Sequence, residues 1–340
     1  MSSGILESEI EDFILNVSEP LRQKLPTRPK KTKVIVLSGP TGVGKTDLSL
    51  IIANALGGEI ISADSMQVYR GMDIGTSKVS QEDRKRVPHH LIDIRDLNQT
   101  FNVVDFYHEA TRAIHDILAK EHVPIIVGGT GFYLHALLYG PPSGPPSTLE
   151  TRQELENEME KVGSRALYER LRQLDADYAA TITGGDRHKI IRALEIIYLT
   201  NKKVSDFHQI LHSKEIPYDF RCWFLYMPKE ILYPRINRRC EYMLESGFLQ
   251  EVSQLEPLLR NNLSASQAIG YRQALDFLKK DQNEVTKEQF IQSFQQASRR
   301  YAKRQFTWFR KEPLFRWLNL IEKTAETAVE IIIQDYELSF

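Results

Sequence analysis

The sequence has few cysteines, no long apolar run and no excess of charge of either sign. Its two cysteines among 340 residues, Cys222 and Cys240, form no CxxC pair and lie near no paired histidines. This scarcity argues against a disulfide framework and against a zinc site. No apolar run approaches the roughly 20 residues that cross a bilayer, and the first charged residues are acidic, unlike those of an export or organelle leader. We therefore expect a cytoplasmic protein without a membrane segment.

The charges are balanced overall but unevenly distributed. Lys and Arg number 44 against 45 Asp and Glu, so the net charge of −1 gives no argument for a nucleic-acid partner. The segment 299–311 nevertheless holds six cations, no acid and four aromatic residues. On a helix, such a segment either neutralises RNA phosphates and stacks on bases, or buries its aromatics and exposes its cations to water. Charge alone favours the second interpretation.

A glycine-rich segment gives the strongest single signal. Residues 39–46 read Gly-Pro-Thr-Gly-Val-Gly-Lys-Thr and directly follow the apolar run 34–37. A strand, such a loop and a helix form a P-loop, whose backbone N–H groups converge on an oligophosphate. Lys45 adds a positive charge, and the Thr46 hydroxyl is a ligand for Mg²⁺. The ligand therefore carries at least two linked phosphates, and the predicted contacts are Gly39, Pro40, Thr41, Gly42, Val43, Gly44, Lys45 and Thr46.

Apolar runs alternate with helical patterns along much of the chain. This alternation predicts an α/β fold with a P-loop NTPase-like parallel sheet flanked by helices. The expected strands are 33–38, 59–62, 90–93, 123–127, 221–227 and 315–318. The expected helices of this part are 45–56, 103–121, 131–138 and a long helix over 287–310.

A proline-rich stretch, 141–146, interrupts the alternation. The pattern after it is helical, over 148–161, 164–174 and 187–200, until the strand-like run 221–227. We interpret 143–212 as a helical insertion into a P-loop core formed by 33–142 and 213–340. Residues 1–32 are interpreted as an extension with a short helix over 10–17.

Two further segments follow strands at the edge where open α/β sheets bind ligands. Asp64 comes after the strand 59–62, where a carboxylate holds Mg²⁺, accepts a proton from a nucleophile or caps the following turn. The strand 123–127 ends in Gly128-Gly129-Thr130-Gly131, which presents N–H groups and the Thr130 hydroxyl to the same edge. Two such loops that face one crevice would hold a diphosphate from both sides.

Six segments resemble, in order, the motifs of bacterial tRNA dimethylallyltransferases, also called tRNA isopentenyltransferases. They are the P-loop, 61–69 with Ser-Ala-Asp-Ser-Met-Gln, 71–76 with Gly-Met-Asp-Ile-Gly-Thr, the Gly128-Gly129-Thr130 turn, 269–273 and 303–310. The resemblance spans about residues 34–318. It implies transfer of a dimethylallyl group from dimethylallyl diphosphate to the N6 amine of the adenosine on the 3′ side of a tRNA anticodon, with release of pyrophosphate.

The resemblance also implies roles for particular residues. Asp64 takes the proton of the adenosine amine, and Mg²⁺ on Thr46 acts with Lys45 on the leaving diphosphate. Thr130, which contacts the diphosphate region, and Arg152, which grips the diphosphate or the tRNA, complete the catalytic set. The target base must leave its stack to reach the crevice, and a single chain and its insertion would hold the anticodon stem-loop. The implied tRNA contacts are Asp64, Ser65, Met66, Gln67, His188, Lys189, Ile190, Ile191, Arg192, Gln267, Ala268, Ile269, Gly270, Tyr271, Arg272, Lys303, Arg304, Gln305, Phe306, Thr307, Trp308, Phe309 and Arg310.

Three other functions remain open at this point. A transferase that prenylates free adenine nucleotides shares the chemistry but needs neither the insertion nor the basic segment 299–311. A small-molecule kinase or ATPase shares the P-loop but requires an adenine site and a lid arginine, which the sequence does not identify. An RNA-binding protein with a vestigial P-loop is disfavoured by the intact Lys45, Thr46 and Asp64.

Overall fold

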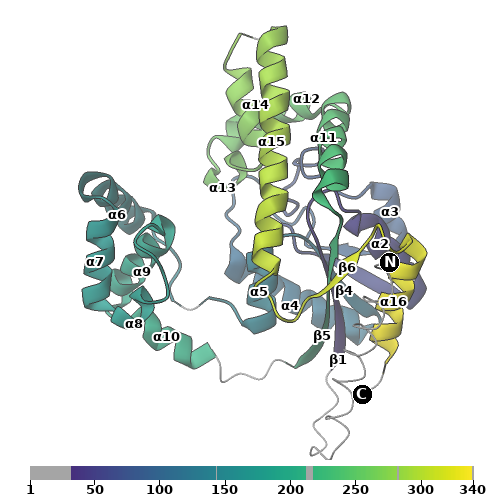
Figure 1. The fold of residues 1–340 in the computed structure, drawn as a ribbon, viewed down its shortest axis with the longest axis horizontal. Coiled ribbons are helices and arrows are strands. Elements are labelled where there is room, and N and C mark those ends of the chain that lie inside the picture. Colours follow the sequence, from purple (N-terminus) through teal and green to yellow (C-terminus); the bar gives the residue numbers. More distant parts are fainter. Residues whose placement is uncertain (1–31, 143, 212–216, 282, 339–340) are drawn as a thin grey trace, which may run out of the picture. The chain divides into compact units, whose positions relative to one another are not determined.

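A parallel sheet forms the centre of the molecule (Figure 1). The computed structural model describes residues 32–142, 144–211, 217–281 and 283–338, so the helix expected over 10–17 lies outside the described residues. The sheet has six strands in the order β3-β2-β4-β1-β5-β6. They are β1 (Thr32–Ser38), β2 (Gly58–Ser62), β3 (His89–His90), β4 (Val123–Val127), β5 (Tyr218–Tyr226) and β6 (Arg316–Asn319). The predicted α/β class with a parallel sheet is confirmed.

Helices cover both faces of this sheet. The helices α2 (Lys45–Leu56) and α16 (Ala325–Glu337) pack together on one face, and α4 (Val103–Ala119) and α5 (Gly131–Tyr139) pack on the other (Figure 1). Because both faces are covered, β1 and β4 are almost continuously apolar and buried. The carboxyl ends of β1, β2 and β4 meet at one edge, and their following loops therefore lie close together.

The predicted strand 90–93 was wrong in its extent. The strand β3 ends at His90, because Leu91 and Asp93 adopt left-handed backbone angles with φ of 61° and 58°. An extended strand has negative φ, so these two residues turn the chain out of the sheet. The short helix α3 (Gln81–Arg86) precedes β3, and its N-cap is Ser80.

A group of helices between β5 and β6 was largely unassigned from the sequence. It comprises α11 (Lys229–Glu245), α12 (Phe248–Leu259), α13 (Leu263–Ser266), α14 (Tyr271–Leu278) and the long α15 (Glu284–Phe309). The helix α15 contacts α11, α14 and α5, and it thereby brings the segment 299–311 to the carboxyl edge of the sheet (Figure 1). None of the described helices has both the length and the apolar character needed to cross a bilayer.

The insertion is a bundle with a hydrophobic core of its own. It contains α6 (Leu149–Val162), α7 (Ser164–Leu174), α8 (Ala176–Ala179), α9 (Arg187–Thr200) and α10 (Val204–Leu211). The side chains of its core include Leu155, Met159, Leu167, Leu171, Ile190 and Leu194. By contacts within the chain, residues 34–216 and 220–340 form one unit that includes both the insertion and the sheet. The domain boundaries proposed at 142 and 213 stay predictions.

Candidate active site

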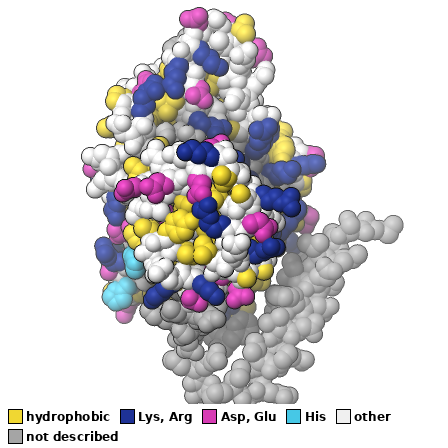
Figure 2. All heavy atoms as spheres, turned by 90° about the vertical axis from the view of Figure 1, so that its left-hand side faces the viewer, with side chains coloured by type: hydrophobic (Ala, Val, Ile, Leu, Met, Phe, Trp, Pro, Cys, Tyr) yellow, Lys and Arg dark blue, Asp and Glu magenta, His cyan; other side chains and the backbone are white. Residues whose placement is uncertain are grey.

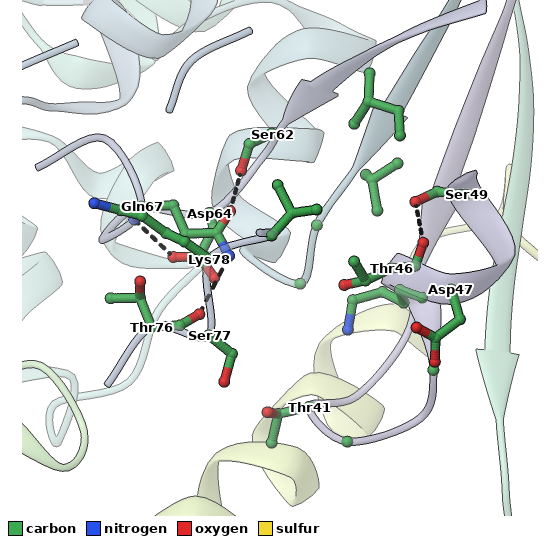
Figure 3. Close-up of a pocket in the computed structure, with 18 of the residues that line it drawn as sticks. Thr41, Thr46, Asp47, Ser49, Ser62, Asp64, Gln67, Thr76, Ser77 and Lys78 are labelled. Carbon is green, nitrogen blue, oxygen red and sulfur yellow. Dashed lines mark hydrogen bonds between the residues drawn. The ribbon is translucent and has the colours of Figure 1, made fainter. Parts of the chain in front are cut away.

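Two adjoining cavities lie at the carboxyl edge of the sheet. The first, of about 410 Å³, is lined by the P-loop, Asp64, Gly128, Gly129 and residues of α11 and α15. Figure 3 shows Thr46 and Asp47 on one side of a cavity, with Asp64 and Gln67 across from them. The second cavity, of about 290 Å³, shares five residues with the first, namely Thr41, Asp64, Thr76, Arg239 and Tyr301. These five residues therefore border both cavities.

The P-loop presents its lysine to the first cavity. Gly44 caps α2 with φ of 103°, a left-handed angle that residues with a side chain rarely adopt. The Lys45 ammonium donates to the carbonyl oxygens of Gly39 and Pro40, both at 2.9 Å. Burial, and then the nearby Arg239 cation, lower the pKa of Lys45 to about 7, although Asp64 opposes the change. A bound phosphate would favour the charged form of this lysine.

Two arginines of α11 reach the P-loop, and the sequence analysis missed both. Arg239 donates through Nη1 to the Thr41 hydroxyl and through Nε to the Ser77 hydroxyl at 3.1 Å. Arg235 donates to the carbonyl oxygen of Gly42 at 3.2 Å. Residues four apart on a helix lie on one face, and this spacing was the available signal. Together with Lys45, the two guanidinium groups place three cations around the P-loop.

Asp64 lies between the two cavities and also caps a turn. Its Oδ1 accepts from the backbone N–H of Met66 at 2.8 Å and of Gln67 at 3.4 Å. Among the described contacts, the capping bonds occupy Oδ1 and not Oδ2. The capping interpretation and the interpretation as a base are therefore compatible, since each requires a different oxygen.

Side chains of α15 join the P-loop to the loop after β4. The Gln305 amide accepts from the Thr41 N–H at 2.9 Å and donates to the Gly129 carbonyl at 3.0 Å. Tyr301 forms a hydrogen bond with the Thr130 hydroxyl, which also accepts from the Ser65 N–H at 3.3 Å. Burial, and then Asp64, raise the pKa of Tyr301, so its hydroxyl stays protonated.

The structure brings Asp64 and Thr130 to the same edge but does not bring Arg152 there. Arg152 is in α6, where its Nε donates to Glu156 at 2.9 Å, one helical turn away. It lines neither cavity. Of Arg152 and Arg239, it is Arg239 that lies beside the P-loop, and the role of Arg152 stays a prediction.

The proposed tRNA contacts separate into exposed and buried side chains. The exposed ones are His188, Lys189, Gln267, Arg272, Lys303, Arg304, Thr307, Trp308 and Arg310. Asp64, Ser65, Met66, Gln67, Arg192, Ile269 and Phe306 are half-buried. Ala268 and Tyr271 are buried but line the second cavity, and Gly270 is buried beside them. The remaining four, Ile190, Ile191, Gln305 and Phe309, are buried, although Gln305 also lines the first cavity, and a contact of these four with RNA stays a prediction.

The surface of the insertion carries both signs of charge. Figure 2, which faces the insertion, shows cationic and acidic side chains interspersed, with apolar side chains among them. Several of its arginines have acidic partners, including Arg170 with Glu158 and Arg187 with Glu160. Cations and acids are mixed on this face, whereas the segment 299–311 has cations and no acid.

These features define a P-loop protein with a carboxylate facing its P-loop across a cavity. The P-loop, a second glycine-rich loop and two arginines surround one space, and Asp64 separates it from the next. The chain belongs to the IPP transferase family, whose sequence model matches residues 67–312.

Individual relatives agree with this family. The chain is 59% identical over 333 residues to a tRNA dimethylallyltransferase of Protochlamydia amoebophila (strain UWE25), covering 97% of each chain. It is 50% identical over 310 residues to that of Chlamydia caviae, covering 91% of each.

Solved structures agree as well. The tRNA isopentenylpyrophosphate transferase of Bacillus halodurans superposes with a TM-score of 0.65 at 38% identity, covering 90% of this chain and 97% of that one. A eukaryotic dimethylallyltransferase, captured acting on tRNA, superposes with a TM-score of 0.74 at 30% identity, covering 89% and 78%.

Proposed function

We propose that this protein transfers a dimethylallyl group from dimethylallyl diphosphate to the N6 amine of the adenosine 3′ to the anticodon in tRNA. One observation carries the proposal: Asp64 borders both a cationic phosphate cavity and a second cavity lined by the tRNA-motif residues Gln267, Ala268 and Ile269. A transfer between two substrates requires such a junction. The eukaryotic relative that acts on tRNA supports the choice of acceptor.

The first cavity holds the diphosphate in this proposal. The P-loop N–H groups and Lys45 contact its oxygens, and Arg239 faces them from α11. The hydroxyl of Thr46 and the carboxylate of Asp47 line the same space and are hard oxygen donors that suit Mg²⁺. These two residues would hold Mg²⁺, which would supply positive charge to the departing diphosphate. These groups stabilise charge that grows as the allylic C–O bond breaks.

The second cavity receives the extruded adenine. Part of its wall is apolar, with Met66, Ile236, Met243 and Phe294 among its side chains, which suits a flat base and a prenyl group. The N6 amine is a weak nucleophile because its lone pair is delocalised into the ring. Asp64 aligns this amine and takes its proton as the new N–C bond forms and pyrophosphate leaves. A monomeric, cytoplasmic enzyme is part of this proposal, and tRNA as substrate supports the cytoplasmic site.

The exposed part of the basic segment supports a contact with tRNA phosphates. Lys303 and Arg304 are exposed beside Tyr301, at the edge of the second cavity. Replacing both with Ala should weaken tRNA binding by about tenfold. It should also lower the salt dependence of binding, because a complex with fewer phosphate contacts releases fewer counterions when it forms. The matched control is Lys85→Ala with Arg86→Ala, two exposed cations of α3. Equal salt slopes for both double variants would argue against this contact.

A product assay tests the proposed reaction. The protein is incubated with Mg²⁺, dimethylallyl diphosphate and a tRNA with adenosine after its anticodon. The tRNA is then digested, and the masses of its nucleosides are measured. Prenylated adenosine from tRNA, and none from free AMP, is the expected result. Prenylation of AMP would support the free-nucleotide transferase, and ATP consumption without prenylation would support a kinase or ATPase.

A further inference from the structure

One loop lines both cavities but supplies none of the reacting groups named above. Gly75 and Thr76 border the second cavity, and Thr76, Ser77 and Lys78 border the first. This loop, residues 71–78, is held from outside by a carboxylate of α12. Glu251 Oε2 accepts from the N–H of Asp73 at 2.9 Å and of Ile74 at 2.6 Å.

The other oxygen of Glu251 completes the hold on the loop. Oε1 accepts from the N–H of Gly75 at 3.2 Å and from the Tyr271 hydroxyl at 2.5 Å. Tyr271 is fully buried, and burial followed by the Glu251 charge raises its pKa, so the phenol remains a donor. One carboxylate therefore accepts three consecutive backbone N–H groups and a phenol. Charge-assisted hydrogen bonds of this kind are stronger than neutral ones.

The loop is also packed too closely to shift without displacing its neighbours. A Cβ built on Gly75 would lie 2.3 Å from the Phe248 ring and 2.5 Å from the Tyr271 ring. On its inner side, Lys78 donates to Asp73 at 2.6 Å, to Asp93 at 2.5 Å and to the Tyr69 carbonyl. The loop is thus fixed from two sides, by Lys78 within and by Glu251 from α12.

Two short chains of hydrogen bonds connect this loop to Asp64 and to Arg239. The Thr76 carbonyl accepts from the Gln67 amide at 3.2 Å, and the N–H of Gln67 contacts the Asp64 carboxylate (Figure 3). The Ser77 hydroxyl accepts from Arg239 at 3.1 Å. A displacement of residues 73–77 would therefore move both the base and the arginine beside the P-loop.

We propose that Glu251, assisted by Tyr271, is a positioning residue for the transfer. By holding the loop 71–78, Glu251 fixes the positions of Asp64 and Arg239. The inference rests on the function proposed above. It assigns Tyr271 to this internal support and not to contact with RNA. Misplacement of reacting groups by about 1 Å lowers rates as much as a hundredfold, so the support is expected to act on turnover more than on tRNA binding.

The variant Glu251→Gln tests this role. An amide keeps one acceptor oxygen but turns an NH₂ group toward the loop N–H donors, so the support is broken without a change of size. We expect kcat to fall by about tenfold to a hundredfold, with the Kd for tRNA unchanged within about twofold. Backbone amides of 71–78 should also exchange hydrogen faster. Glu256→Gln on the same helix, which removes only the partner of Arg260, should change neither quantity.

A second variant separates positioning from a general loss of stability. Tyr271→Phe removes one of the four hydrogen bonds and should lower kcat by about threefold to tenfold. It should have no further effect in the Glu251→Gln background, because the phenol acts through the carboxylate. The inference would be overturned if folded Glu251→Gln kept the wild-type kcat or if hydrogen exchange of the 71–78 amides were unchanged. Additive effects of the two substitutions on kcat would overturn it as well. An inactive wild-type protein would instead overturn the proposed function, and the exchange measurement would still test the support.

Discussion

The crevice at the sheet edge and the helical insertion are built in opposite ways. In the crevice, contacts join residues far apart in the chain, such as Thr41 and Gln305, separated by 264 positions. In the insertion, the core comes from residues 155–204, and the buried Glu195 binds Ser147 and Thr148, at most 48 positions away. The crevice therefore depends on the whole fold, whereas the insertion depends mainly on itself. We infer that chemistry belongs to the first region and that the second adds affinity for RNA.

The largest expected effect is that of Asp64→Asn. Asparagine keeps an oxygen for the N–H groups of Met66 and Gln67, so the turn survives while the base is lost. Turnover should fall by about a hundredfold or more, with tRNA affinity nearly intact. Single-turnover prenylation and tRNA titration measure the two quantities. Near-normal turnover would show that Asp64 is not the base and would weaken the contrast between the crevice and the insertion.

Arg239→Ala should have the next largest effect. It removes the cation that faces Lys45 and Thr41, and we expect kcat/KM for dimethylallyl diphosphate to fall by about tenfold to a hundredfold. Arg238→Ala is the matched control, because Arg238 is exposed on the same helix and lines neither cavity. Equal kinetics for the two variants would contradict the assignment of Arg239 to the diphosphate.

Leu167→Ala tests whether the insertion can be weakened alone. Leu167 is fully buried in the insertion core, and its truncation should cost about 2–5 kcal/mol of local stability. Affinity for tRNA should fall by about tenfold, and pyrophosphate binding to the crevice should be unchanged. The control is Leu174→Ala, a partly exposed leucine at the end of the same helix. Loss of pyrophosphate binding in Leu167→Ala would show that the two regions are not independent.

The smallest expected effect is a pH dependence confined to the crevice. With a pKa of about 7, Lys45 is mostly charged at pH 6 and mostly neutral at pH 8 in the protein alone. Diphosphate binding should therefore take up most of one proton at pH 8 and little at pH 6, and affinity should fall about fivefold between pH 7 and 8. Calorimetry in buffers of different ionisation enthalpy measures the uptake. Lys45→Arg, which stays charged, should lack it; equal uptake in both proteins would assign the proton to another group.

Much of the fold could be predicted from the sequence, because the patterns that indicate its strands and helices are local. The strands β1 and β4 are short apolar runs, and the long helix over 287–310 was found within a few residues of α15. The helices α11 and α12 were not found, and each contains an internal proline, Pro234 and Pro257, which normally argues against a helix interior. The strand 90–93 was overextended because φ at Leu91 and Asp93 leaves no mark in the hydrophobic pattern.

The sequence by itself determined the P-loop, the carboxylate at the end of β2 and the basic segment, because each is a short pattern with a fixed local geometry. Only the tertiary structure decided which side chains complete the site. Arg239 and Gln305 reach the crevice from helices distant in the chain, and Glu251 holds the loop 71–78 beside it. The spacing of Arg235 and Arg239 places them on one helix face, but it does not show that this face meets the P-loop. The fold also buried Tyr271 and Ile190, which the motifs alone had placed against RNA. Packing over long sequence separations thus sets the roles that residue types leave open.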